Sequence, residues 1–524
     1  MASHASDLWD LVGLARGVLP RVEYGFRSES WTGAPWHVVR VDLVEELSAP
    51  YRLELELIVE DLSTDIDAML GSSCELTIGR GAGGRAVCGI VMQLDDRGAL
   101  GDRRLVRIEI GPALTLLAQR VDTRAWQDRT GPEIVQAVLA EGLAPYRRQV
   151  RLALSSQEYV KRDYCTQLRE SDLAFVARLM EEEGISYYFQ HEGGLETMVL
   201  VDHNAGFPLL STRADSDAVA ILDVEAETAG IESVQSFVWT RRLCSTSVVQ
   251  SDFDFGRPEA SQVYSAPGTD GGGREREVYL HDEQVFTEDG ARRAQVRREQ
   301  LVVSGKVARG EGNVTEFAPG VRFRLVDHRR VELDRFYVLR RVRHTGECPE
   351  EVIERARAEA APRYVNEYEC VPDDVPVRPE RRHFKPRVYG PMTATVTGPP
   401  SEEVHTDEHG RVKVIFPWDR SSPRDDTSSW WVRVAQSWAG PGWGSVWLPR
   451  IGMEVVVEFL DGDPDRPLIT GCVYNGRNPP PYPLPGEKTK SSIKSNSSPT
   501  NGGFNELRIE DQAGAEEVFL HAER

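Results

Sequence analysis

The fold is decided by a stretch that begins VYGPMTATVTGP (388–399), continues as TDEHGRVKVIFPWDR (406–420) and ends EVVVEFLDGDPDRPLITGCVYN (454–475). Within it, short runs of β-branched and aromatic residues alternate with Gly-, Pro- and Asp-rich turns, which is typical of strands joined by tight connections. Five strands in about 90 residues favour an OB-type Greek-key barrel over a sandwich, which needs roughly seven. The predicted strands are 395–397, 412–416, 431–434, 453–459 and 468–473, and the predicted packing residues of the barrel include Trp431, Val455, Val457 and Phe459.

Long strings in this stretch and beyond it resemble the signature of VgrG proteins, the trimeric spikes of type VI secretion systems. Upstream, the resemblance is carried by YCTQLRESDLAFVARLMEEEGISYYF (164–189), SDFDFGRP (251–258) and FRLVDH (323–328). Because independent motifs follow in the family's order over nearly the whole chain, the resemblance is far more specific than one short pattern. In the barrel and after it, the motifs are TDEHGRVKVIFPWDR (406–420), WVRVAQSWAG (431–440), PRIGMEVVVEFLDGDPDRPLITGCVYN (449–475) and NELRIEDQAGAEEVFLHAE (505–523).

The resemblance implies a domain organisation that is mainly β with minor α. Residues 1–370 correspond to a phage-tail-hub-like module of two tube-type β-barrel domains with smaller appended domains, and three copies form a ring with approximate sixfold symmetry. A linker (371–387) leads into the OB-fold barrel (388–475). A second linker, rich in Pro and Ser (476–503), precedes the start of a trimeric β-helix (504–524). Only about 30 residues lie between barrel and needle, too few for an enzyme domain.

Length, charge and cysteine content narrow the functional classes. The 524 residues are too many for one hydrophobic core, so two to four domains are expected. A formal net charge of -21 opposes binding to a phosphate backbone, which excludes nucleic acid as an expected partner. Seven scattered cysteines without a C-x-x-C pair indicate a reducing compartment. Asp7 and Asp10 interrupt the N-terminal apolar stretch, so no Sec signal peptide is predicted.

The region before the barrel shows strands first and helices later. Alternating apolar residues at 37–47 and 51–60 predict strands. GRGAGG (79–84) matches a dinucleotide-binding pattern, but a strand-like AVCGIVMQL follows where a helix is required, so we predict a hairpin turn. Cys74 and Cys88 could face each other across that hairpin, and free buried thiols are the preferred interpretation.

Three helices are predicted between the strands. The first, over 130–142, has Thr130 as N-cap, Glu133 completing a capping box and Gly142 as its stop. A second runs from Ser171 to Gly184 and a third over about 287–300. The second ends in three consecutive glutamates, which could suggest a glycosidase acid and base. Adjacent helical positions point about 100° apart, so we interpret them as a solvated helix end. These glutamates are Glu181, Glu182 and Glu183.

Other candidate sites for chemistry are weak. The histidines show no H-E-x-x-H or similar metal-ligand spacing and no G-x-S-x-G occurs, so we predict no catalytic residues, metal or cofactor. His405 and His409 flank a barrel turn and are interpreted as solvated turn residues. Six tryptophans between Trp418 and Trp447 could form a base-stacking platform. Because few basic residues are interleaved, packing within or between barrels is the preferred interpretation.

The last twenty residues supply two alternating strands that cannot fold alone. Their four apolar side chains would contribute roughly 6 to 12 kcal/mol when buried, whereas ordering each of some 14 residues costs about 1 to 2 kcal/mol. Three chains that wind their strands into a prism bury the same side chains on a shared axis. We therefore predict a trimer core made by Leu507, Ile509, Val518 and Leu520.

The combined interpretation is a structural protein rather than an enzyme. The resemblance implies a homotrimeric spike that caps the Hcp tube, contacts baseplate components and a PAAR-repeat tip protein, carries effector proteins with their adaptors, and pierces target membranes. It would assemble in the bacterial cytoplasm and then be secreted without a signal peptide into a target cell or the medium. The alternative is a hub-spike of another contractile particle, such as a phage tail or tailocin baseplate. A glycosidase or another enzyme is the third hypothesis.

Overall fold

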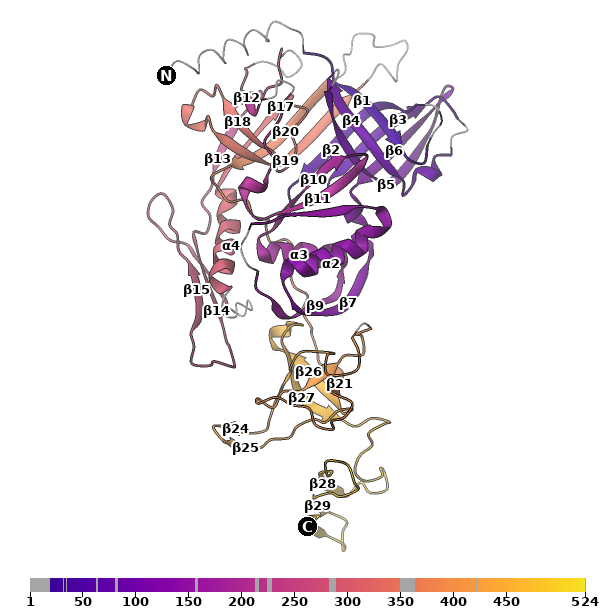
Figure 1. Cartoon of the computed structure of the whole chain (residues 1–524), viewed down its shortest axis with the longest axis vertical. Helices are drawn as coiled ribbons and strands as arrows, with labels where there is room; N and C mark the ends of the chain where they lie inside the picture. Colours follow the sequence, from indigo (N-terminus) through magenta and orange to yellow (C-terminus); the bar gives the residue numbers. More distant parts are fainter. Residues whose placement is uncertain are drawn as a thin grey trace. The chain divides into compact units, whose positions relative to one another are not determined.

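The computed structural model describes residues 19–31, 33, 35–62, 65–80, 83–155, 159–212, 216–223, 229–281, 289–348, 363–420 and 422–523 (Figure 1). The N-terminal stretch used for the signal-peptide prediction, and the residues 287 and 288 of the third predicted helix, lie outside these ranges. The chain divides into two compact units. Unit 1 comprises 1–120, 130–160 and 171–384, and unit 2 comprises 121–129, 161–170 and 385–524.

Unit 1 is built on a twelve-stranded sheet with the path β1-β4-β5-β6-β3-β2-β19-β20-β17-β13, to which β18 and β12 are added beside β19. The sheet forms because its strands alternate apolar and polar residues, which gives each strand one buried face. Its strands are β1 (Glu23–Ser28), β2 (His37–Glu46), β3 (Arg52–Val59), β4 (Ser73–Arg80), β5 (Gly83–Leu100), β6 (Arg103–Gly111), β12 (Ala218–Ala220), β13 (Val238–Arg241), β17 (Lys306–Gly312), β18 (Arg322–Val326), β19 (Phe336–Glu347) and β20 (Arg363–Pro372).

Two hydrophobic cores lie on this sheet, one on each side of the β2–β19 pair. The first is formed mainly by β1 to β6 and includes Leu43, Leu55 and Ile108. The second is formed mainly by β17 to β20 with the segments before them and includes Phe323 and Tyr337. The predicted β-rich class is confirmed, and the predicted pair of tube-type barrel domains stays a prediction.

A buried ionic cluster joins the two halves of the sheet. The Arg85 side chain from β5 is paired with Glu45 from β2, and Arg85 also lies 3.1 Å from Nε2 of His344 on β19. The ring of His344 is 2.7 Å from the hydroxyl of Tyr364 on β20. Burial alone would raise the pKa of the Glu45 carboxyl, but the charge of Arg85 and the hydrogen bond from His344 lower it to about 2.

Two smaller sheets and three helices complete unit 1 in the described ranges (Figure 1). The sheet β10-β11-β8 packs through Val199 and Val201 against Val338 and Val371 of the large sheet. The sheet β15-β14-β16 lies beside α4. The strands are β8 (Gln149–Ala153), β10 (Ser186–Glu192), β11 (Leu195–Val201), β14 (Ser247–Asp252), β15 (Gln262–Ala266) and β16 (Glu277–His281). The helices are α2 (Gly131–Leu143), α3 (Asp172–Glu183) and α4 (Gly290–Val302).

The helix ends confirm the predicted caps with one exception. Thr130 and Glu133 form the predicted capping box of α2, and α3 starts after Ser171 and stops at Gly184, whose φ is 73°. Gly142 was predicted as the stop of α2, and this prediction was wrong. It lies inside the helix, where a β-carbon would meet Leu117 at 3.0 Å, so the glycine allows close packing instead.

The hairpin predicted at 79–84 is confirmed, since Arg80 at the end of β4 pairs with Gly83 at the start of β5. Residues 81 and 82 of the turn lie outside the described ranges. Cys74 pairs with Gly89 while Cys88 pairs with Glu75, so the two thiols are offset by one position and belong to opposite sheet faces. Both cysteines are free and buried.

Unit 2 contains the predicted five-stranded barrel. The sheet runs β22-β21-β26-β27-β23, and the bridge between Val412 and Val432 joins its two ends. Closure leaves no free edge at this point, which confirms the barrel. Its core includes Val396, Val414 and Ile469. The strands are β21 (Met392–Thr397), β22 (Lys413–Ile415), β23 (Arg433–Val434), β26 (Glu454–Phe459) and β27 (Pro467–Val473).

Two segments from the middle of the hub region belong to unit 2. The strands β7 (Val121–Arg129) and β9 (Arg162–Ser171) pair with each other, and β9 contacts the barrel. The ring of Tyr164 stacks on Trp430 at 5.5 Å, and the backbone amide of Thr166 donates to Asp465 at 2.6 Å. Sequence analysis had placed these strands within a continuous hub module, because their long-range partners cannot be read from local pattern.

Candidate assembly surface

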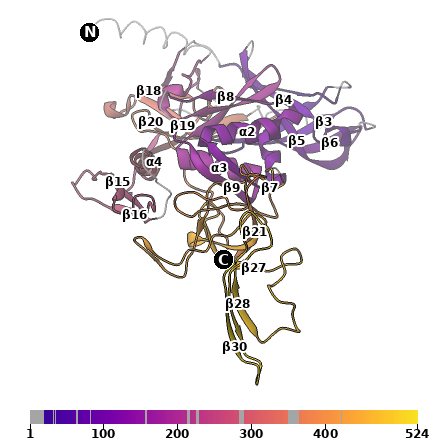
Figure 2. The ribbon, with the colours of Figure 1, turned by 60° about the horizontal axis from the view of Figure 1, so that its bottom comes forward.

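The terminal sheet consists of β28 (Lys490–Lys494), β29 (Glu506–Glu510) and β30 (Glu517–His521), which lie alongside one another in that order (Figure 2). Two of these strands were predicted. β28 lies within residues 476–503, which were predicted to be a linker, so that prediction was wrong for this strand. The strand was missed because Ile493 is the only large aliphatic residue in a run of Lys and Ser. A single apolar residue gives no period, and only pairing with β29 makes this strand recognisable.

One face of the terminal sheet is apolar and open. In the register, Ile493 pairs with Leu507, which pairs with Leu520, and Ile509 pairs with Val518. Directly paired residues project to the same side, so all five share one face. In a single chain this face is uncovered, with exposed fractions of 42% for Leu507 and Ile509 and 81% for Leu520. The predicted common face is therefore present, and its burial on a threefold axis stays a prediction.

The opposite face of the same sheet is satisfied within the chain. The Arg508 guanidinium lies over the Phe519 ring at 4.3 Å and donates to Glu517 at 2.7 Å. The Glu506 carboxyl accepts from the hydroxyls of Tyr482 at 2.6 Å and Ser492 at 2.7 Å. Burial opposes ionisation of Glu506, but these hydrogen bonds lower its pKa. The polar face of the terminal sheet is therefore paired within the chain, whereas no described segment of the same chain covers its apolar face.

The predicted packing residues of the barrel divide into two groups. Val455 and Val457 are fully buried in its core, and Phe459 packs against that core. Trp431 is not among the core residues. Strand alternation sends Val432 inward, so Trp431 lies on the outer side, where its ring packs in a tilted arrangement against His405 with the centroids 4.8 Å apart.

The three consecutive glutamates at the end of α3 are not solvated, and that prediction was wrong. Glu181 accepts from His383 at 2.7 Å and from the backbone amides of Arg382 and His383. Glu182 lies 3.3 Å from Arg178, and Glu183 is paired with Arg292. Arg178 lies one turn earlier in the same helix, whereas His383 and Arg292 come to α3 from later segments of the chain, which no local pattern shows. Each carboxylate has its own partner, so no acid–base pair is formed.

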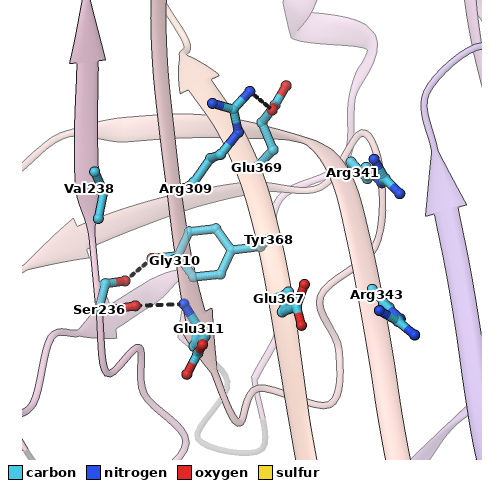
Figure 3. Close-up of a pocket in the computed structure, with 10 residues that line it drawn as sticks. All are labelled: Ser236, Val238, Arg309, Gly310, Glu311, Arg341, Arg343, Glu367, Tyr368 and Glu369. Atoms are coloured by element: carbon cyan, nitrogen blue, oxygen red, sulfur yellow. Dashed lines mark hydrogen bonds and ion pairs between the residues drawn. The ribbon is translucent and has the colours of Figure 1, made fainter.

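A groove of about 470 Å³ lies on the large sheet (Figure 3). Arg309 is paired with Glu369, and the Tyr368 hydroxyl donates to the backbone oxygen of Ser236 at 2.8 Å. The Ser236 hydroxyl accepts from the backbone amide of Glu311 at 2.9 Å. The groove is therefore polar, and these interactions hold the Glu369 carboxylate and the hydroxyls of Tyr368 and Ser236 within the sheet. They are Ser236, Val238, Arg309, Gly310, Glu311, Arg341, Arg343, Glu367, Tyr368 and Glu369.

The predicted turn histidines also form no metal site in the described structure. His405 is 2.8 Å from Glu402, and Nε2 of His409 is 3.9 Å from Glu408. Among the residues that the structure describes, no group of three or more His, Cys, Asp or Glu could hold a metal ion. Within the same ranges, none of the helices has the length and apolar character needed to cross a bilayer.

Sequence profiles of three families match successive parts of the chain. The phage tail baseplate hub (GPD) profile matches residues 44–349, and the profile of the type VI secretion system/phage-baseplate injector OB domain matches 396–474. The profile of the bacteriophage T4 gp5 C-terminal trimerisation domain matches 491–524, the segment that carries the open apolar face. Curated spike proteins named VgrG are similar along nearly the whole chain. The chain belongs to the VgrG family.

Among these VgrG relatives, spike protein VgrG4b of Pseudomonas aeruginosa is 36% identical over 499 residues, which are 92% of this chain and 60% of that protein. VgrG5 of the same organism is 37% identical over 494 residues, 92% of this chain and 61% of its own length. The chain thus spans about 60% of the length of these two relatives. The actin cross-linking toxin VgrG1 of Vibrio cholerae is 35% identical, and the match covers 90% of this chain and 43% of that toxin.

Solved structures show the same fold at low sequence identity. The E. coli c3393 protein, described as a type VI secretion component similar to T4 tail proteins gp27 and gp5, has a TM-score of 0.59 at 18% identity. That match covers 86% of this chain and 99% of the solved chain. A chain of the half-lidded PdpA-VgrG complex of Francisella has a TM-score of 0.61 at 9% identity, and the match covers 99% of this chain and 91% of that one. These matches confirm the hub-like fold of this VgrG chain.

Proposed function

We propose that this VgrG chain is the hub-and-spike subunit of a type VI secretion system, in which three copies form one rigid spike that acts mechanically. The observation that carries this proposal is the terminal sheet, whose apolar face is open in one chain and lies in the segment that matches a trimerisation domain. Three copies would turn Leu507, Ile509 and Leu520 toward a common axis. Burial of such side chains stabilises an assembly by about 1.5 to 3 kcal/mol each.

In the proposed assembly, the hub contacts the end of the tube, and the spike forms the end that reaches the target first. Unit 1 matches the baseplate hub profile, which supports contact of its ring with an Hcp tube and with baseplate components. We infer from the family that a PAAR-repeat protein caps the spike and that effector proteins, with their adaptors, are carried on it. The spike would pierce the target membrane and leave the bacterial cytoplasm without a signal peptide.

The chain itself is proposed to have no enzymatic activity. The glutamates at the end of α3 are each paired with a cation or a backbone donor, and in the groove on the large sheet Glu369, Tyr368 and Ser236 are held by neighbouring groups. Purified protein should therefore release no product from peptidoglycan, nucleotides or lipids. Turnover that disappears in Glu182→Gln would contradict this.

The alternative assignment is a hub-spike of a phage tail or tailocin baseplate, since the hub profile is described for phage tails. The relatives named type VI secretion spike proteins favour the first assignment. A pull-down with purified tube proteins separates them. Trimeric protein should retain the type VI tube protein, whereas selective retention of a phage tail-tube protein would support the alternative.

The trimer itself is tested by molar mass. Light scattering of the purified chain should give three times its 58.6 kDa over the micromolar range. A stable monomer at these concentrations would remove the proposed function, because the open face of the terminal sheet would then have no partner.

A further inference from the structure

Unit 2 carries an exposed aromatic element that lies outside the five barrel strands and the terminal sheet. Residues 436–447, here called the tryptophan hairpin, contain the paired strands β24 (Ala439–Gly440) and β25 (Trp443–Gly444). No charged residue occurs between 434 and 449. The exposed fractions are 65% for Trp438, 56% for Trp443 and 59% for Trp447.

The exposed rings are held in a defined position. The Gln436 side chain accepts from the backbone amide of Trp447 at 2.9 Å and donates to its carbonyl at 3.2 Å. The rings of Trp438 and Trp443 meet edge to face at 5.1 Å. At Gly444 the φ is 136° and a β-carbon would lie 2.4 Å from the Trp438 oxygen, so this turn requires glycine. The hairpin thus presents preorganised rings, which reduces the entropy that binding would cost.

The exposed apolar area is of the size that often marks an interaction site. A tryptophan buries about 150 to 250 Å² when covered, so three rings that are more than half exposed leave on the order of 300 Å² uncovered. Monomeric proteins rarely expose a larger continuous apolar patch without using it. Tryptophan is also the residue type most enriched among side chains that dominate binding energy at protein interfaces.

The barrel next to the tryptophan hairpin is hydrogen-bonded to the connection between β28 and β29 of the terminal sheet. The Arg450 guanidinium, just after the hairpin, donates to the backbone oxygen of Asn496 at 2.8 Å. Glu403 accepts from the amide of Thr500 at 2.8 Å and, through its backbone oxygen, from Ile451 at 3.1 Å. Barrel, hairpin and terminal sheet belong to one compact unit. A threefold axis through the terminal sheets therefore also gathers three barrels and three hairpins.

We propose that the tryptophan hairpin of one copy packs on the barrel of the next copy and locks neighbouring barrels together. This inference rests on the proposed trimer. A cyclic trimer uses two different patches on each copy, one that inserts and one that receives. Met453, Val473 and Tyr474 lie at one end of the β26–β27 pair, with exposed fractions of 39%, 40% and 63%, and are the proposed receiving surface.

A photo-crosslinker tests this contact in the full chain. Trp443 is replaced by p-benzoylphenylalanine, an aromatic residue of similar size, the trimer is irradiated, and adducts are mapped by mass spectrometry. The expected adducts join position 443 of one copy to residues 388–475 of another. A trimer that yields only adducts within one copy, or none, overturns this inference and leaves the proposed function intact. A monomer instead removes the proposed function, and the inference falls with it.

Substitution supplies the energetic test. Trp438→Ser with Trp443→Ser should raise the concentration of half-dissociation at least tenfold, as expected for two interface aromatics. Tyr389→Ser is the matched control, because this ring is 97% exposed in the same unit but outside the hairpin, and it should leave dissociation unchanged. Equal dissociation of both variants overturns the inference. Binding of the trimer to phosphatidylglycerol vesicles that is lost only in the tryptophan variant, without adducts between copies, would assign the hairpin to a membrane surface and also overturn it.

Discussion

The large sheet of unit 1 and the terminal sheet of unit 2 differ in how they bury their apolar residues. In unit 1, Leu43, Leu53 and Leu55 have no exposed surface in a single chain. In the terminal sheet, Val518 and Leu520 are exposed by 74% and 81%. The alternation along the strands is the same in both. Unit 1 therefore buries its apolar side chains within one chain, whereas the terminal sheet needs a partner chain to bury them.

The largest effect is expected when a charge is placed on the open face. Ile509→Asp would bring three carboxylates to one apolar axis, where unpaired burial costs several kcal/mol each. Limited proteolysis should cleave the terminal segment much faster, by at least 100-fold, while thermal unfolding of unit 1 stays unchanged. Gln512→Asp is the control, because it adds the same charge at an exposed turn. Unchanged proteolysis of Ile509→Asp would contradict the role of this face.

The next effect is expected at the ionic cluster inside unit 1. Glu45→Gln leaves the buried Arg85 without its counter-charge, which lowers the free energy of unfolding by about 3 to 5 kcal/mol. Denaturant titration of unit 1 measures this. Glu60→Gln, which removes the surface pair with Arg103 at 3.2 Å, should cost at most about 1 kcal/mol. Equal losses in the two variants would mean that burial does not distinguish the pairs.

The pH dependence of unit 1 should be set in part by His191. Burial and the nearby Arg85 charge together lower the pKa of this imidazole from 6.5 to about 4, against the opposing charge of Glu45. Between pH 4 and pH 6.5, the unfolded chain binds a proton at this position that the folded chain does not bind. The free energy of unfolding therefore falls as the pH drops from 6.5 to 4, and the total decrease is about 3 kcal/mol. In His191→Gln this part of the slope should vanish, and a slope that persists would assign it to other groups.

The smallest effect is expected at the start of α2. Thr130→Ala removes the hydroxyl that accepts from the Glu133 amide at 3.3 Å, which should lower the unfolding free energy of unit 1 by about 1 kcal/mol. Thr130→Ser keeps the acceptor and should be close to neutral. A loss as large in the Ser variant would show that the methyl group matters rather than the cap. Trimer mass should be the same in both variants.

Local signals in the sequence were sufficient where one element carries the whole pattern. The capping box at Thr130, the stop at Gly184 and the turn at 79–84 follow from two to four neighbouring residues, and the structure confirms them. The barrel strands were found for the same reason, since each alternates over several residues. Gly142 was misassigned because a glycine serves equally as a helix stop and as a site of close packing, and only the position of Leu117 distinguishes the two.

By itself, the sequence determined the β-rich class, the closed barrel, the family and the common face of Leu507, Ile509, Val518 and Leu520, because a period of two fixes which side chains share a face. Only the tertiary structure decided which partners meet. It brought His383 and Arg292 to the α3 glutamates, paired β28 with β29, and placed β7 and β9 in the barrel's unit. It also left the tryptophan hairpin uncovered. Such contacts join residues tens to hundreds of positions apart, and no local period records them.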